Sequence, residues 1–157
     1  MRHREPFLDR NPKPGTWDRA FAWIGDCVTV GNEEYIHYGG YAEGHKPGTR
    51  QIGMAKLRKN GFVSYDAGTS IGTLRTKLLS LTPRLEVNAR IRGEMQVRLL
   101  DESDKPVRGC DWADCVPIRG DSLAHVVRWQ SPLPKTVRGR LEFKLRDGAL
   151  FGFEVLP

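Results

Sequence analysis

The run LEVNARIRGEMQVRL at residues 85–99 alternates apolar and polar side chains along nearly its whole length. The apolar members are Leu85, Val87, Ala89 and Ile91, followed by Met95, Val97 and Leu99. A period of two residues is typical of a β-strand with one buried face, and no helical period competes with it. Because Arg92-Gly93-Glu94 separates the two runs and contains a glycine, the sequence predicts a hairpin of two strands here.

The same alternation continues toward the C-terminus, at residues 123–129, 141–145 and 151–155. Asp147-Gly148 between the last two runs predicts another hairpin turn. About seven or eight strands at this spacing predict an antiparallel, jelly-roll-like β-sandwich over residues 61–157, with inward rows of Leu, Val, Phe and Trp as its core. Trp129 lies on one of these alternating runs, and we assign it to that core.

The first sixty residues show a different pattern of apolar and polar side chains. Residues 1–16 are polar and rich in proline, which predicts an extended arm or linker. Within residues 17–60, short apolar runs separated by turn residues predict four strands, at 20–24, 27–30, 35–38 and 52–57. Four short antiparallel strands make one blade of a β-propeller. The expected fold is therefore all-β, a propeller-blade-like sheet followed by a sandwich, with Trp23 in the core of the blade.

A single blade cannot cover both of its own faces, because neighbouring blades normally do so. The sequence therefore predicts that residues 17–60 pack against the sandwich, against another copy of the chain or against a missing propeller.

Composition is that of an ordinary globular protein, with 157 residues, 39% hydrophobic, and a formal net charge of +6. A basic balance attracts nucleic acid, acidic polysaccharide or anionic membrane surfaces. Arginine and lysine alternate along the predicted strands, which favours solvated sheet faces as the explanation of the charge. No nucleic-acid-binding motif accompanies it, so a basic nucleic-acid-binding domain stays an alternative without a motif.

Three cysteines, Cys27, Cys110 and Cys115, form neither a disulfide framework nor a metal set. The odd count predicts small buried hydrophobic residues in a reducing compartment, and whether Cys110 and Cys115 are bridged stays open. No apolar signal segment and no bilayer-spanning stretch is visible, so we expect no membrane partner and, if the chain is complete, a cytoplasmic protein.

Four short segments, in this order and spacing, resemble the last blade of five-bladed propeller glycoside hydrolases of families 32, 43 and 130. They are REPF at 4–7, GTWD at 15–18, EYIHYGG at 34–40 and IGMA at 52–55. Residues 57–68 and 114–129 resemble the exit from that propeller and the middle of its C-terminal sandwich. The resemblance implies that the catalytic carboxylates belong to earlier blades. We therefore assign no catalytic residue and expect no hydrolysis by this chain alone.

Five residues are candidates for carbohydrate contact: Trp17, Asp18, Tyr41, His45 and Trp112. Tyr41 and His45 belong to a glycine-rich loop at residues 39–48, and such loops often carry function. Trp17 and Asp18 could place a ring and a carboxylate together, or close the blade core and cap a turn. Trp112 lies in an irregular acidic segment, where it predicts either a sugar platform or a cover for one end of the sandwich.

No cofactor or metal site is predicted. Five aspartates suggest calcium, but their spacing fits no calcium loop and favours solvated turns; they are Asp101, Asp104, Asp111, Asp114 and Asp121. The histidines at 3, 37 and 125 are too dispersed for zinc.

The function these patterns favour is a non-catalytic C-terminal module that supports a catalytic propeller and binds an oligo- or polysaccharide, with an acidic one favoured by the charge. Three alternatives stay open. The first is an assembly protein that associates through exposed β edges without a ligand. The second is a glycoside hydrolase completed by a partner chain, and the third is the nucleic-acid-binding domain.

Overall fold

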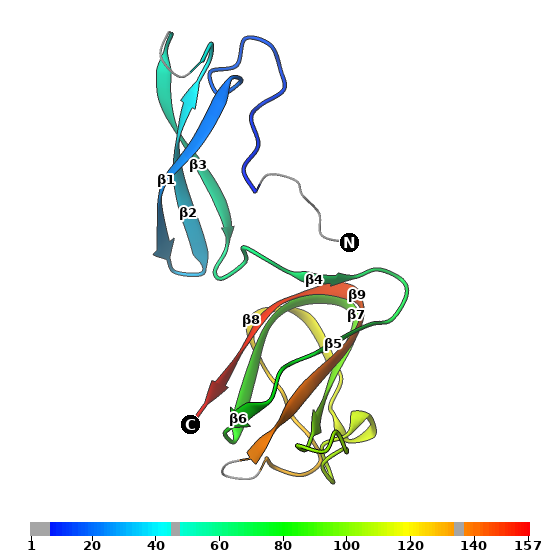
Figure 1. The fold of residues 1–157 in the computed structure, drawn as a ribbon. Coiled ribbons are helices and arrows are strands. Elements are labelled where there is room, and N and C mark those ends of the chain that lie inside the picture. Colours follow the sequence, from blue (N-terminus) through cyan, green and yellow to red (C-terminus); the bar gives the residue numbers. More distant parts are fainter. Residues whose placement is uncertain (1–6, 45–47, 134–136) are drawn as a thin grey trace. The chain divides into compact units, whose positions relative to one another are not determined.

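The structure is a computed structural model that describes residues 7–44, 48–133 and 137–157. Within these ranges every regular element is a β-strand except one turn of 3-10 helix, Trp112–Asp114, so the predicted all-β class is confirmed (Figure 1). Contacts divide the chain into two compact units, Met1–Lys59 and Asn60–Pro157.

The N-terminal unit contains a three-stranded antiparallel sheet in the order β1-β2-β3. Its strands are β1 (Phe21–Val30), β2 (Glu33–Tyr41) and β3 (Arg50–Arg58). The predicted number of four strands is wrong for the described residues, because segments 20–24 and 27–30 form the single strand β1. The register shifts between Ile24 and Asp26, so Gly25 lies at a bulge where the sequence predicted a turn.

The C-terminal unit is built on two long antiparallel strands that curve strongly (Figure 1). Its main sheet has the order β4-β9-β7-β8, and β5 and β6 also pair with β9. The strands are β4 (Tyr65–Ala67), β5 (Gly72–Arg75), β6 (Leu79–Leu81), β7 (Arg84–Leu100), β8 (Ile118–Val126) and β9 (Val137–Leu156). This curled, sandwich-like arrangement agrees with the predicted fold class.

Both predicted hairpins of the C-terminal unit are wrong. Residues 85–99 belong to one strand, β7, and Asp147-Gly148 lies inside β9. The two irregular points face each other, since Ile91 pairs with Gly148 and the next pair is Glu94 with Arg146. A Cβ atom at Gly93 would lie 2.3 Å from the carbonyl oxygen of Arg146, so this close approach requires a glycine. The glycines therefore mark bulges at which both strands bend together.

The core lies inside the curl and is made by the alternating side chains. The fully buried members include Leu85, Val87, Met95, Val97 and Leu99 of β7 and Leu141, Phe143 and Leu145 of β9. Trp129 packs against this cluster, as predicted, and its indole N–H donates to the carbonyl of Val97 at 2.8 Å.

Two of the three cysteines are buried in this core. Cys110 and Cys115 are free thiols, and burial raises the pKa of both. Cys27 and Trp23 of the N-terminal unit were both expected to be buried. Both expectations are wrong, because Cys27 is exposed and Trp23 is 63% exposed. Alternation places Trp23 on one face of β1, but a three-stranded sheet has no second layer of its own to cover that face.

Candidate functional site

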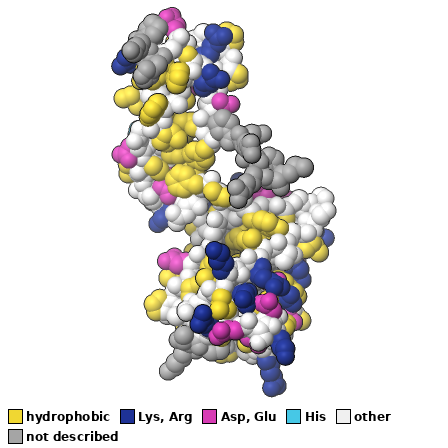
Figure 2. All heavy atoms as spheres, viewed as in Figure 1, with side chains coloured by type: hydrophobic (Ala, Val, Ile, Leu, Met, Phe, Trp, Pro, Cys, Tyr) yellow, Lys and Arg dark blue, Asp and Glu magenta, His cyan; other side chains and the backbone are white. Residues whose placement is uncertain are grey.

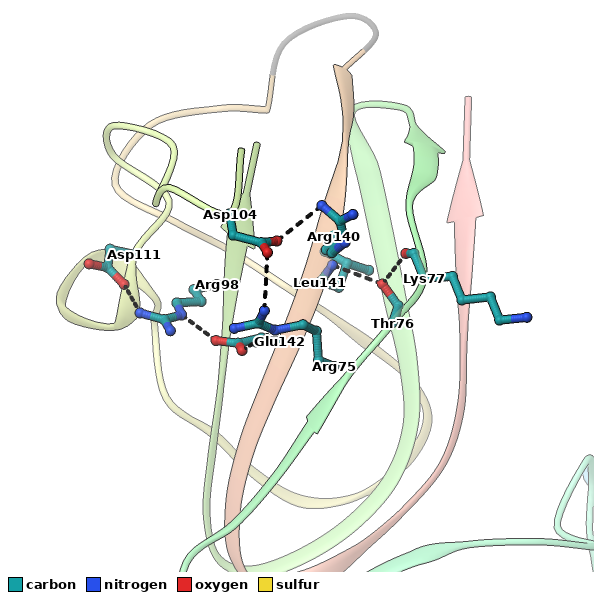
Figure 3. A network of polar contacts seen from close by, with 9 residues as sticks. All are labelled: Arg75, Thr76, Lys77, Arg98, Asp104, Asp111, Arg140, Leu141 and Glu142. Atoms are coloured by element: carbon teal, nitrogen blue, oxygen red, sulfur yellow. Dashed lines mark hydrogen bonds and ion pairs between the residues drawn. The ribbon is translucent and has the colours of Figure 1, made fainter. Parts of the chain in front are cut away.

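A network of charged side chains covers the outer face of β5, β7 and β9 (Figure 3). At its centre, Glu142 of β9 accepts hydrogen bonds from Arg75 Nε at 2.6 Å and from Arg98 Nε at 2.5 Å. Strand register explains the grouping, because Glu142 is paired with Arg75 on β5 and with Arg98 on β7. Side chains directly opposite each other on adjacent strands project to the same face of a sheet. Phe143, the next residue, points into the core.

Two aspartates extend the network at its margins (Figure 3). Asp104 pairs with Arg140 at 3.0 Å and with Arg75 at 3.5 Å, and Asp111 pairs with Arg98 at 3.5 Å. These aspartates were weighed as calcium ligands, but in the structure their carboxylates are engaged by arginines.

Glu142 is unsuited to proton donation. Burial by itself raises the pKa of its carboxyl, but the hydrogen bonds from Arg75 and Arg98 outweigh burial and the pKa is lowered. Glycoside hydrolysis needs a carboxylic acid that holds its proton and a second carboxylate across the scissile bond. The hydrogen bonds of Glu142 join β5, β9 and β7 across this face of the sheet.

Trp112 lies on the same outer face, above β7 and β9. Asp111 and Asp114 form a reciprocal capping box around its short helix, and Gln96 Nε2 donates to the carbonyl oxygen of Trp112 at 3.0 Å. The Arg98 guanidinium and the Lys144 ammonium each lie 4.7 Å from the centroid of the indole ring. Backbone anchoring and two cation–π contacts thus hold the ring in one place.

Two groups at Trp112 are available to a ligand. Within the described ranges, the indole N–H has no hydrogen-bond acceptor, and the Lys144 ammonium has no carboxylate partner. The ring is half-buried, so part of its surface also remains open. A stacking surface, an N–H donor and an unpaired cation together match a sugar that carries a negative charge.

The side chain of Trp17 covers part of one face of the N-terminal sheet. Its ring stacks on Tyr38 with centroids 5.5 Å apart and planes 19° apart. A Cβ atom at Gly40 would lie 2.2 Å from Trp17 Cζ3, and one at Gly53 would lie 2.6 Å from Cη2. Two glycines far from Trp17 in sequence therefore make room for its ring. Asp18 beside it is buried, and its Oδ2 accepts from the Tyr38 hydroxyl at 3.3 Å.

Tyr41 and His45 were the remaining candidates. Tyr41 ends β2, meets Phe21 edge-on and lies under the guanidinium of Arg50, whereas His45 is outside the described residues. A pocket of about 630 Å³, not foreseen from sequence, lies nearby. Its lining comprises residues 9–12, Arg19, Ala20, Ala42 and Glu43, which include the residues directly after Asp18 and Tyr41. The structure therefore places Trp17, Asp18 and Tyr41 in one unit, and Trp112 in the other.

The opposite face of the N-terminal sheet is rich in exposed hydrophobic side chains. Register places on this one face Phe21, Trp23, Val28 and Val30 of β1, Tyr35 and Tyr41 of β2, and Ile52 and Met54 of β3. Ile52 is 82% exposed and Met54 53%. Figure 2 shows hydrophobic side chains gathered on this unit. This face thus exposes apolar side chains, and it also carries Arg50 over Tyr41 and the Glu33–Lys56 ion pair beside Tyr35.

In the part of the chain that the structure describes, no three His, Cys, Asp or Glu side chains gather to hold a metal ion. No helix there has the length and apolar character needed to cross a membrane. Comparisons with protein-family models, with curated proteins and with solved structures found no match.

Proposed function

We propose that this chain is a non-catalytic carbohydrate-binding module that holds an acidic oligosaccharide at Trp112. The observation that carries the proposal is the anchored indole ring beside the ammonium of Lys144, which has no carboxylate partner among the described residues. The ring offers a surface for the C–H side of a sugar, and the ammonium attracts its carboxylate or sulfate. The resemblance to the C-terminal part of propeller glycoside hydrolases supports the same function.

We expect removal of the ring to abolish most of this binding. The Trp112→Ala variant should bind an oligogalacturonate at least about tenfold more weakly than the parent chain, because stacking and the N–H donor are lost together. Isothermal titration calorimetry of the full chain measures the change. The matched control is Trp23→Ala, which removes an exposed tryptophan from the other unit and should leave the affinity unchanged.

The Lys144→Gln variant separates the two parts of the proposed interaction. It should weaken binding of the oligogalacturonate and spare any binding of a neutral oligosaccharide of the same length, since only the charge is removed. An unchanged affinity in both Trp112→Ala and Lys144→Gln, with folding verified by circular dichroism, would refute the proposal. Equal losses in Trp112→Ala and Trp23→Ala would refute it as well.

A second candidate function is assembly through the open apolar face of the N-terminal sheet. Trp23, Ile52 and Met54 are each more than half exposed on that face, and an uncovered patch of this kind marks an interaction surface. In a propeller, a neighbouring blade covers the corresponding face.

If the face joins two copies, the chain should dimerise with rising concentration in sedimentation velocity runs. Ile52→Lys should abolish the dimer, because it places a charge at the centre of the contact. Val63→Lys, at a position that is 76% exposed in the C-terminal unit, is the control and should leave the dimer intact. A monomer at all concentrations, or equal effects of both variants, would contradict assembly of copies through this face.

A further inference from the structure

A second concave surface lies at the edge strand β8 and shares no lining residue with the Trp112 site. It is a pocket of about 290 Å³ lined by residues 116–119, His125, Val126 and Arg128. Pocket volumes for drug-sized ligands begin at about 300 Å³, so this one fits a small ligand or a single group of a larger one.

The pocket forms because the chain folds back on itself around β8. Cys115 pairs with Trp129, and the N–H of Val116 donates to the carbonyl oxygen of Arg128 at 2.9 Å. Residues 116–119 and residues 125–128 are thereby brought together, and side chains of both segments line one pocket.

Among the described residues that line the pocket, the polar side chains are all basic. They are Arg119, His125 and Arg128, and none of these described lining residues is a carboxylate. Arg119 is already bound to Glu94 at 2.6 Å. Arg128, by contrast, makes no side-chain hydrogen bond or ion pair within the described ranges. Arg128 is exposed, and a guanidinium at a hollow that is not bound to a described carboxylate is suited to a planar or tetrahedral oxyanion.

In its imidazolium form, His125 can contribute a second donor. Its Nε2 lies 3.2 Å from the carbonyl oxygen of Ala89, and because a carbonyl only accepts, Nε2 carries the hydrogen of this bond. Nδ1 is then the ring nitrogen left for a ligand, and it donates to an oxyanion only when the ring carries a proton on both nitrogens. Val116 and Val126, both more than a third exposed, add apolar surface for the body of a ligand.

We propose that this pocket binds the oxyanion of a small ligand, a carboxylate or a phosphate, through Arg128 and His125. The inference does not depend on the Trp112 site. The two chemical sources of the anion are a sugar acid and a phosphate ester, and they are distinguished by using two probes.

The experiment is a titration of the full chain, labelled with nitrogen-15, with sodium glucuronate and separately with sodium phosphate at constant ionic strength. We expect saturable amide shifts at residues 116–128 for at least one probe, with a Kd of about 1–10 mM. The tighter probe identifies the source of the anion. Arg128→Gln should weaken binding at least about fivefold, and His125→Gln should weaken it in the same direction.

Arg138→Gln is the matched control, because it removes the same charge from an exposed position on β9. It should change the Kd by less than about twofold, which separates a site from general attraction to a basic protein. Absence of saturable shifts with both probes would overturn the inference. Equal weakening by Arg128→Gln and Arg138→Gln would overturn it too, whatever the result at Trp112.

Discussion

The Phe143→Ala variant should lose about 3–5 kcal/mol of the free energy of unfolding of the C-terminal unit. Phe143 is fully buried in the middle of β9, opposite Val97 on β7, and its ring lies 5.5 Å from that of Phe153. Truncation removes the transfer energy of the ring and leaves a cavity between strands that are held on both sides by pairing. Urea unfolding followed through the amide signals of residues 60–157 measures the loss.

The neighbouring residue provides the control. Lys144→Ala should cost at most about 1 kcal/mol, because Lys144 lies on the outer face and its side chain makes a cation–π contact with the ring of Trp112. A slip of β9 by one residue would exchange the two side chains between core and surface. Similar losses in the two variants, or a larger loss in Lys144→Ala, would therefore contradict the register of β9.

The Glu142→Gln variant should lose about 2–3 kcal/mol of the free energy of unfolding. The Glu142 side chain is 6% exposed and bridges Arg75 and Arg98. The amide therefore removes the carboxylate that the two guanidinium groups share and leaves each only its longer ion pair, with Asp104 or Asp111 at 3.5 Å. Removing one partner of a fully buried pair costs about 3–5 kcal/mol. The value expected for Glu142→Gln is lower, because this pair is not fully buried: the side chains of Arg75 and Arg98 are 45% and 24% exposed.

The same carboxyl gives the network a pH dependence of known sign. Because the pKa of Glu142 is lower in the folded chain than in the unfolded one, its contribution is fully present above the unfolded value, about 4.3. The contribution falls as pH drops below that value and through the folded pKa. Unfolding of the parent chain and of Glu142→Gln, measured between pH 7 and about pH 3, should therefore converge at the acid end.

Asp147→Asn is the control for Glu142→Gln. It breaks the exposed pair of Asp147 with Arg92, and asparagine tolerates the positive φ of 48° found there. An exposed pair contributes at most about 1 kcal/mol, so this variant should remain close to the parent. A loss in Glu142→Gln no larger than in Asp147→Asn, or one that does not change with pH, would contradict a stabilising role of the network.

The sequence pointed to some residues of the candidate sites and gave no sign of others. Trp112 was a candidate because a tryptophan in an irregular acidic segment is conspicuous, and Asp111 and Asp114 three residues apart are a local signal for the cap that holds it. Arg98 and Lys144 carry no such signal, since they reach the ring only through the pairing of β7 with β9. Glu142 was missed for the same reason, because its two arginines lie 67 and 44 residues away in the chain.

The sequence by itself determined that the chain is all-β and which side chains of residues 85–99 and 141–145 face the core. Alternation is a local property, since it depends only on the two-residue period of an extended backbone. The tertiary structure alone decided whether Gly93 and Gly148 make turns or bulges, because a glycine allows both and the choice depends on the strand that lies opposite. It also decided which charges meet at Glu142 and which ring rests on Gly40 and Gly53, since these contacts follow from register between distant strands.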